Sequence, residues 1–216
     1  MVTKPVRLDG SLPFFVATSN EGKLREIIPL VHEFFPDVQT IQGRAAKVAE
    51  ETASSFTGNA EIKARALASE IGSLDCYILA DDSGLEVEAL GGQPGLLSAR
   101  YAGDHVDPQA HMQKLLQELD RVPGGSVNRR ARYVCALALL ENRQGRVRCQ
   151  VSEGYCYGSI APSPNGDSGF GYDPIFIAQD LGKSLGELPY EAKDKISHRR
   201  RAFEALVQSR GPVNGS

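Results

Sequence analysis

Several features that would identify common protein classes are missing from this sequence. Its four cysteines, at positions 76, 135, 149 and 156, form no C-x-x-C pair, and this spacing excludes zinc-finger and thioredoxin-type sites. No apolar run is long enough to span a membrane, and residues 1–13 lack the hydrophobic core of a signal peptide. Neither sign of charge dominates, since 24 lysines and arginines face 27 aspartates and glutamates. We therefore expect a soluble cytoplasmic protein with reduced thiols that binds no nucleic acid and no membrane.

The apolar pattern that is present predicts an α/β domain. At 216 residues and 41% hydrophobic, the chain can form a sizeable core, as one large or two small domains. Periodicity predicts helices over 24–35, 59–71 and 197–208 and one starting at Asp107-Pro108, and strands over 14–17, 77–80, 85–90, 133–140, 147–151 and part of 154–160. Pro29 should kink or shorten the first helix. We expect a mixed sheet flanked by helices, divided into two lobes around a cleft.

An adjacent acidic pair, Asp81-Asp82, follows the apolar run Tyr77–Ala80 and precedes Ser83-Gly84. A strand that meets a glycine-containing turn is a usual place for carboxylates that hold a hard metal or move a proton. Because side chains alternate along a strand, only one of the two aspartates should face the working side. Taken alone, the segment fits a plain surface turn better.

The loop Thr18-Ser19-Asn20-Glu21-Gly22-Lys23 lies between a predicted strand and a predicted helix. Free backbone N–H groups and the helix dipole make such a loop an anion site, and Lys23 adds a cation. It is not a Walker A loop, because Leu24 stands where that motif has the magnesium-binding Ser or Thr. A capped helix start with a solvated lysine explains the same residues equally well.

Three further segments carry polar groups that suit a nucleotide site. Asn59 and Lys63 share one helix face, and Glu51 could join Asp82 as a magnesium ligand, since such a site needs only one or two carboxylates. The stretch 168–174 offers Phe170 and Tyr172 for stacking on a base, although the segment taken alone fits better with both rings folded onto the core. The stretch 193–199 places donors at or before a helix N-terminus, where they bind an anion or decorate a surface.

These motifs together resemble the inosine triphosphate pyrophosphatase family, the HAM1-like or RdgB-like non-canonical purine NTP pyrophosphatases. The motifs that carry the resemblance, in the family's order, are the 18–23 loop, Glu50-Glu51-Thr52, Asn59-Ala60 with Lys63-Ala64, Ala80–Leu85, Gly91-Gly92 with Pro94-Gly95, Ser98–Gly103, Gly169–Pro174 and Ser197-His198-Arg199. The match spans residues 14–208 as one domain, and residues 1–13 and 209–216 are expected to be flexible termini. Leu97, where the family usually has an aromatic, and Ser168, where a glycine is common, depart from the pattern.

The resemblance implies Mg²⁺-dependent hydrolysis of dITP, ITP and XTP to the nucleoside monophosphate and pyrophosphate. It also implies an elongated mixed α/β fold and a homodimer. By the same resemblance, Glu51 and Asp82 bind the metal, Asp82 accepts a proton and Lys23 contacts phosphate. The residues that it assigns to substrate binding are Thr18, Ser19, Asn20, Glu21, Gly22, Lys23, Ser83, Phe170, Gly171, Tyr172, Asp173, Lys193, His198 and Arg199. Asp81, Asn59, Lys63 and Arg100 are expected near the site without assigned roles.

Three other functions compete with this one. A Maf-type pyrophosphatase would prefer other nucleotides, but its N-terminal loop is rich in serine and arginine, unlike Thr18–Lys23. A non-catalytic nucleotide sensor would be favoured by loss of Glu51 or Asp82, and both are present. A nucleic-acid-binding role for Arg199–Arg201 is weakened by the net charge of −3.

Overall fold

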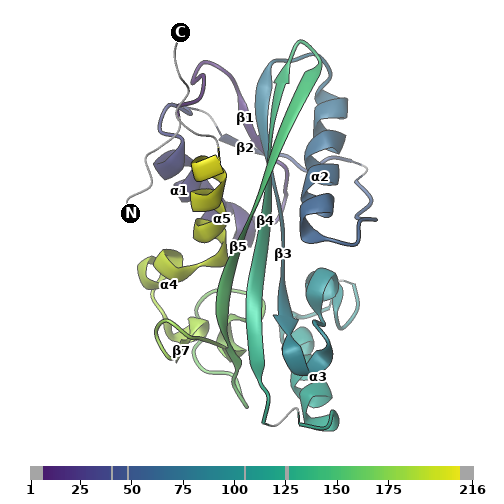
Figure 1. Ribbon diagram of the computed structural model, residues 1–216, viewed down its shortest axis with the longest axis vertical. Helices are drawn as coiled ribbons and strands as arrows, with labels where there is room; N and C mark the ends of the chain where they lie inside the picture. The colour runs from purple at the N-terminus through teal and green to yellow at the C-terminus, as the bar shows by residue number, and fades with distance from the viewer. Residues whose placement is uncertain (1–6, 40, 48, 105, 125–126, 210–216) are drawn as a thin grey trace. The chain divides into compact units, whose positions relative to one another are not determined.

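The computed structural model describes residues 7–39, 41–47, 49–104, 106–124 and 127–209, which form a mixed seven-stranded sheet with flanking helices (Figure 1). The strand order is β2-β1-β3-β4-β5-β6-β7, with β1 parallel to β2 and β3, and β6 antiparallel to β5 and β7. The strands are β1 (Phe14–Val16), β2 (Ile41–Gly43), β3 (Cys76–Val87), β4 (Arg130–Arg143), β5 (Arg146–Ile160), β6 (Phe176–Ala178) and β7 (Lys183–Ser184). The helices are α1 (Glu21–Phe34), α2 (Phe56–Ile71), α3 (Pro108–Arg121), α4 (Tyr190–Ile196) and α5 (His198–Ser209). The predicted α/β class with a mixed sheet is confirmed.

The chain divides into two compact units. The first unit comprises Met1–Asp82, Cys135–Gly154 and Arg199–Ser216, and the second comprises Ser83–Val134 and Tyr155–His198. Strands β3, β4 and β5 each contribute residues to both units. The cleft expected from the sequence stays a prediction.

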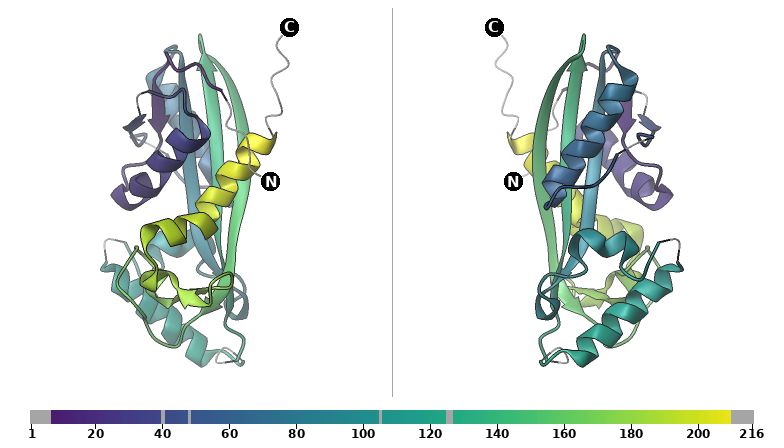
Figure 2. Two further views of the ribbon diagram at one scale, coloured as in Figure 1. Left: turned by 90° about the vertical axis from the view of Figure 1, so that its left-hand side faces the viewer. Right: turned by 90° about the vertical axis from the view of Figure 1, so that its right-hand side faces the viewer.

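In the first unit, helices cover both faces of the strands. Helices α1 and α5 lie on one face and α2 lies on the other (Figures 1 and 2). The core under α1 and α5 takes alternate residues of β3, Tyr77 and Leu79, together with Phe203 of α5. Because strand side chains alternate, Asp81 continues this row toward α1 and α5, whereas Asp82 points to the face that α2 covers.

The acidic pair does not form the turn that the sequence predicts. Strand β3 runs without a break through Asp81, Asp82, Ser83 and Gly84 as far as Val87. β3 is hydrogen-bonded to its neighbour β4 in the sheet. The backbone hydrogen bonds between the two strands outweigh the local preference of an Asp-Ser-Gly sequence for a turn.

Other elements differ in their bounds from the predictions. Helix α1 continues through Pro29 to Phe34, and α2 begins at Phe56, where the side chain of Ser55 accepts a hydrogen bond from the Gly58 N–H. Helix α4 was not predicted, and Lys193 lies inside it rather than before a helix. Of the termini expected to be flexible, residues 1–6 and 210–216 lie outside the described residues, whereas Leu8 packs in the core of the first unit.

The second unit has its own core, in which α3 packs Met112, Leu115 and Leu119 against Leu85 and Phe176 of the strands. The predicted start of α3 is confirmed, since the side chain of Asp107 accepts the Gln109 N–H at 2.8 Å. Among the described residues, no helix is both long and apolar enough to cross a membrane.

Candidate functional site

The loop between β1 and α1 has the geometry of an anion site. Pairing of β1 with β3 reaches Val16 and Leu79, so the loop leaves the carboxyl end of a parallel strand, the usual place for ligands in such sheets. Thr18 Oγ1 accepts the Asn20 N–H and Asn20 Oδ1 accepts the Lys23 N–H, both at 3.1 Å. These two bonds fix the loop at the N-terminus of a 14-residue helix.

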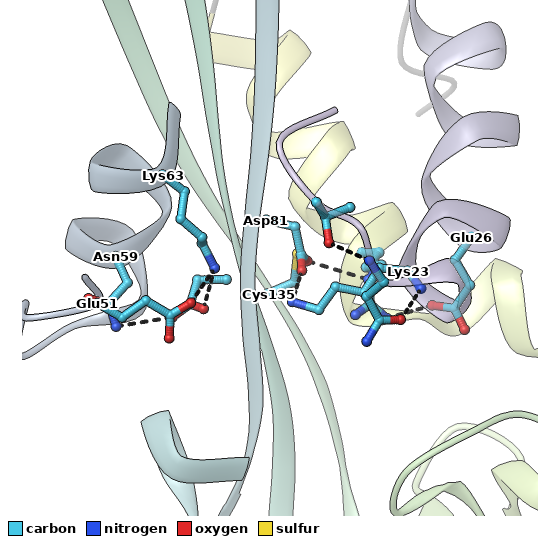
Figure 3. A network of polar contacts seen from close by, with 11 residues as sticks. Lys23, Glu26, Glu51, Asn59, Lys63, Asp81 and Cys135 are labelled. Carbon is cyan, nitrogen blue, oxygen red and sulfur yellow. Dashed lines mark hydrogen bonds and ion pairs between the residues drawn. The ribbon is translucent and has the colours of Figure 1, made fainter. Parts of the chain in front are cut away.

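Lys23, which the family resemblance assigns to phosphate, contacts Asp81 in this structure. Lys23 forms an ion pair with the fully buried carboxylate of Asp81. The Cys135 thiol donates to Asp81 at 3.1 Å, and Arg199 Nε lies 3.4 Å from the same oxygen. Arg199 also binds Glu26 at 2.5 Å, so one continuous polar network lies between β3, α1 and α5 (Figure 3).

The charges in this network fix the protonation states of its members. Burial alone would raise the pKa of Asp81, but Lys23, Arg199 and Lys63 together lower it far below its ordinary value. Burial and the neighbouring Asp81 raise the pKa of the Cys135 thiol well above its usual range. Asp81 is therefore a carboxylate at neutral pH, and Cys135 keeps the proton that it donates.

Lys63, Glu51 and Asn59 lie on the opposite side of β3 from Asp81 (Figure 3), and Lys63 donates to Asp82. Lys63 Nζ lies 2.7 Å from Asp82 and 3.1 Å from Glu51. Asn59 Nδ2 lies 3.4 Å from Asp82, while its Oδ1 accepts the Ala53 N–H at 3.0 Å. Asn59 is buried on the face of α2 that packs against the sheet, so the shared helix face is confirmed, but it is not a solvent-facing pair.

Electrostatics in this second group favour a bound cation. Burial raises the pKa of Asp82 more than Lys63 lowers it. Burial alone would lower the pKa of Lys63, but Asp82, Asp81 and Glu51 outweigh that effect and raise it. The positive charge of the Lys63 ammonium thus lies between the carboxylates of Glu51 and Asp82 and interacts with both. Among the described residues, no group of three or more His, Cys, Asp or Glu side chains is placed so that it could hold a metal ion. Magnesium needs only one or two protein carboxylates, and Glu51 and Asp82 supply two.

In the second unit, the loop before β6 and helix α4 meet at Asp173. This buried carboxylate binds Lys193 Nζ at 2.6 Å, accepts the Phe170 N–H at 2.8 Å and accepts the Tyr133 hydroxyl at 3.2 Å. Lys193 Nζ also lies 5.0 Å from the centre of the Phe170 ring. The structure therefore groups Phe170 and Asp173, which share one sequence motif, with Lys193 from a segment later in the chain.

The two aromatic residues of this loop have different surroundings. Phe170 is 38% exposed, whereas Tyr172 is buried. The Tyr172 hydroxyl donates to the Ser98 carbonyl at 3.0 Å, and burial raises the pKa of that hydroxyl. Tyr172 thus ties the loop to the Ser98 segment rather than presenting a free ring.

Tyr133 was missed in the sequence, where it begins an apolar run. Its ring stacks on the His198 imidazole, with the ring centres 4.8 Å apart and the planes at 11°. The tyrosine hydroxyl was the one feature of the sequence that could have indicated a role for this residue. A buried tyrosine hydroxyl needs a hydrogen-bond partner, and the apolar side chains of its own strand offer none. His198 and Arg199, neighbours in one predicted motif, belong to different units, since Arg199 lies in the Asp81 network.

Fold and side chains together define an α/β protein with a capped loop between β1 and α1 and a pair of carboxylates that share the Lys63 ammonium. The chain belongs to the Ham1 family, whose sequence model matches residues 14–209.

Similar proteins agree with this membership. A dITP/XTP pyrophosphatase of Bacillus cereus is 41% identical over 194 residues, which cover 89% of this chain and 92% of that protein. A dITP/XTP pyrophosphatase of Zymomonas mobilis is 44% identical over 194 residues, covering 89% of this chain and 88% of the relative. The structure of the Staphylococcus aureus Ham1 protein matches with a TM-score of 0.74 at 35% identity, covering 91% and 97% of the two chains. A HAM1 protein of Coxiella burnetii gives 0.75 at 35% identity, covering 92% and 98%.

Proposed function

We propose that this protein is a nucleoside triphosphate pyrophosphatase that hydrolyses dITP, ITP and XTP to the nucleoside monophosphate and pyrophosphate. Relatives at 41% and 44% identity over most of the chain bear the name dITP/XTP pyrophosphatase. The observation that carries the proposal is that Glu51 and Asp82 share one cation, the Lys63 ammonium. Asp82 is the neighbour on β3 of Asp81, whose carboxylate binds Lys23. Phosphoryl chemistry needs such a pairing of cation sites with an anion-binding loop.

Glu51 and Asp82 are the proposed Mg²⁺ ligands. The position of the Lys63 ammonium supports this assignment, because a cation already lies 3.1 Å from the Glu51 carboxylate and 2.7 Å from the Asp82 carboxylate. A magnesium ion bound there supplies neutralisation of phosphate charge and a more acidic water. Lys63 is then free to turn from the carboxylates to a phosphate oxygen, because its long side chain carries a mobile charge.

The proposed chemical step is in-line attack of water on the α-phosphorus. The oxygen of water bonds to phosphorus as the bond to the β-phosphate oxygen breaks, and pyrophosphate leaves. Asp82 accepts the proton of the attacking water. Lys23, with the Thr18–Lys23 loop and the first N–H groups of α1, stabilises negative charge on the phosphates. Ser83, the next residue along β3, is proposed to contact the substrate.

Base recognition is assigned to the remaining predicted residues. Phe170 supplies an exposed ring for stacking, and Lys193, His198 and Arg199 supply donors for the 6-oxo group of hypoxanthine or xanthine. Adenine presents an amine donor at that position, so the donors would meet no acceptor. A site built around such buried polar groups discriminates by about 10⁴ or more.

A homodimer and a cytoplasmic location complete the proposal. The homodimer rests on the family resemblance, and the location rests on the sequence features described above. The oligomeric state is measurable by light scattering of the purified protein at several concentrations.

Product analysis tests the proposed activity. The protein is incubated with Mg²⁺ and, separately, with dITP, ITP, XTP, GTP, ATP and dUTP, and the products are separated by ion-exchange chromatography. Monophosphate and pyrophosphate from the first three substrates are expected. Release of single phosphates, or preference for dUTP, would overturn the proposal, and dITP binding without turnover would indicate a sensor. An Arg65→Gln variant, which changes an exposed charge of α2 paired with Glu61, is the matched control for variants of Lys63.

A further inference from the structure

Tyr133 on β4 contacts two of the elements assigned to base recognition. It is buried, and its ring packs against His198 at 4.8 Å between ring centres and against Phe176 at 4.7 Å. Its hydroxyl donates to Asp173 Oδ1 at 3.2 Å. One side chain on a long, buried strand therefore contacts both the loop before β6 and the residue that begins α5.

Asp173 transmits the position of Tyr133 to the loop. Its second oxygen, Oδ2, accepts the Phe170 N–H at 2.8 Å and binds Lys193 Nζ at 2.6 Å. The fit is close: a Cβ added at Gly169, which has a φ of +80°, would lie 2.1 Å from that oxygen. A small displacement of the Asp173 carboxylate therefore moves the Phe170 backbone and the Lys193 ammonium together.

We propose that Tyr133 is a positioning residue for base recognition, acting on His198 through its ring and on Lys193 and Phe170 through its bond to Asp173. This inference rests on the proposed function and adds a residue that the sequence motifs do not contain. The contacts of Tyr133 described above are with residues assigned to base recognition, so its loss should affect the choice of base more than the chemistry at phosphorus.

Two substitutions separate the actions of the ring and the hydroxyl. Tyr133→Phe keeps the stacked ring and removes the hydroxyl donor to Asp173, so a rise in KM for dITP of about 3- to 10-fold is expected with kcat nearly unchanged. Tyr133→Leu also removes the flat surface under His198. Since a misplacement of about 1 Å costs about 10²-fold, a loss of 30- to 100-fold in kcat/KM for dITP is expected. The ratio of dITP to dATP hydrolysis should fall with it.

The control variants remove comparable groups elsewhere in the second unit. Tyr101→Phe deletes a buried tyrosine hydroxyl bonded to Glu118, and Leu115→Ala opens a cavity in the α3 core. Both should leave the ratio of dITP to dATP hydrolysis unchanged at a temperature where each variant is folded. If Leu115→Ala lowers that ratio as much as Tyr133→Leu does, the effect is general loosening of the unit and the inference is wrong.

A spectroscopic readout reports on the ring contact without any turnover. The chain has four histidines, so the imidazole signals of His198 can be assigned by comparison with a His198→Asn spectrum. The stacked Tyr133 ring should shift these signals upfield, and the shift should persist in Tyr133→Phe and vanish in Tyr133→Leu. Unchanged His198 signals in Tyr133→Leu would refute the positioning role.

The wild-type protein separates this inference from the function on which it rests. If wild-type protein releases pyrophosphate from none of the substrates, the proposed function fails, whatever the variants do. If it prefers dITP and the Tyr133 variants keep the wild-type KM and base preference, the proposed function stands and the positioning role is refuted. Should Tyr133→Leu fail to fold, Tyr133→Phe alone decides the role of the hydroxyl.

Discussion

Replacing each aspartate of the Asp81-Asp82 pair by asparagine should damage the protein in opposite ways. The two side chains are neighbours in sequence but lie on opposite sides of β3, each with its own lysine. Asp81→Asn should lower stability and leave most of the chemistry intact. Asp82→Asn should abolish most of the turnover and leave the fold nearly as stable as before.

The stability cost of Asp81→Asn follows from the charges left behind. The Arg199 side chain is 3% exposed, so the substitution removes the charge of Asp81 from a buried guanidinium that keeps its ion pair with Glu26. Breaking a buried ion pair by removing one partner costs about 3–5 kcal/mol. Because the Lys23 side chain is 18% exposed and can turn to water, a loss near the lower end, about 3 kcal/mol, is expected. For a chain of 216 residues this corresponds to a fall in Tm of about 6–12 °C.

Asp82→Asn should cost no more than about 1 kcal/mol of stability. Burial raises the pKa of Asp82, which means that the folded protein holds this charge at a cost that a neutral amide avoids. Lys63 keeps Glu51 as a partner at 3.1 Å. As the proposed proton acceptor, Asp82 should instead contribute about 10²–10⁴ to kcat.

Urea unfolding and dITP turnover, measured on the same preparations of both variants, test this crossed pattern. Equal losses of unfolding free energy in the two variants would show that the aspartates are not separated as the structure indicates. Full turnover in Asp82→Asn would remove that residue from the chemistry.

The remaining predictions concern pH, metal and a second buried pair. Because the pKa of Asp81 is lowered in the folded protein, its stabilising effect should be fully present above the ordinary aspartate pKa and be lost as the pH falls through the folded-state pKa. The free energy of unfolding, measured between pH 7 and pH 2, should therefore fall less in Asp81→Asn than in wild type. Parallel curves for the two proteins would contradict this. Mg²⁺ at 100 times its dissociation constant should stabilise the wild type by about 2.7 kcal/mol in thermal unfolding but not Glu51→Gln, and an equal shift in both would exclude Glu51 as a ligand. Lys193→Met should leave the buried Asp173 without its cation at a cost of about 3–5 kcal/mol, and an unchanged urea midpoint would show that the pair is not needed.

Much of the fold can be predicted from local sequence patterns, because long apolar stretches and clear caps give strong signals. Strand β4 and the Asp107 cap of α3 are examples. Helix α4 was missed because it has only seven residues and shows no apolar stripe. After Glu191 it carries three more charged residues, Lys193, Asp194 and Lys195. The predicted turn at Asp82-Ser83 was wrong because pairing within a sheet depends on a neighbouring strand distant in sequence.

The candidate site shows the same limit more sharply. The residue types were readable, since carboxylates, lysines and a glycine-containing loop each predict a kind of chemistry. Which lysine meets which aspartate was not, because the answer depends on the face of the sheet that each helix covers. The network that joins Cys135 to Asp81 has no local signal at all, as the two residues are 54 positions apart.

The three-segment make-up of the first unit has a consequence for synthesis on the ribosome. Its core needs Ala202, Phe203 and Leu206 of α5, which are made well after the core residues of α1 and the strands. At about 5–20 residues per second, the chain emerges with Asp81 long before its partner Arg199 exists. A nascent or prematurely ended chain therefore carries Asp81 without Arg199 and an apolar face without α5, both features that cellular quality control can distinguish from the finished protein.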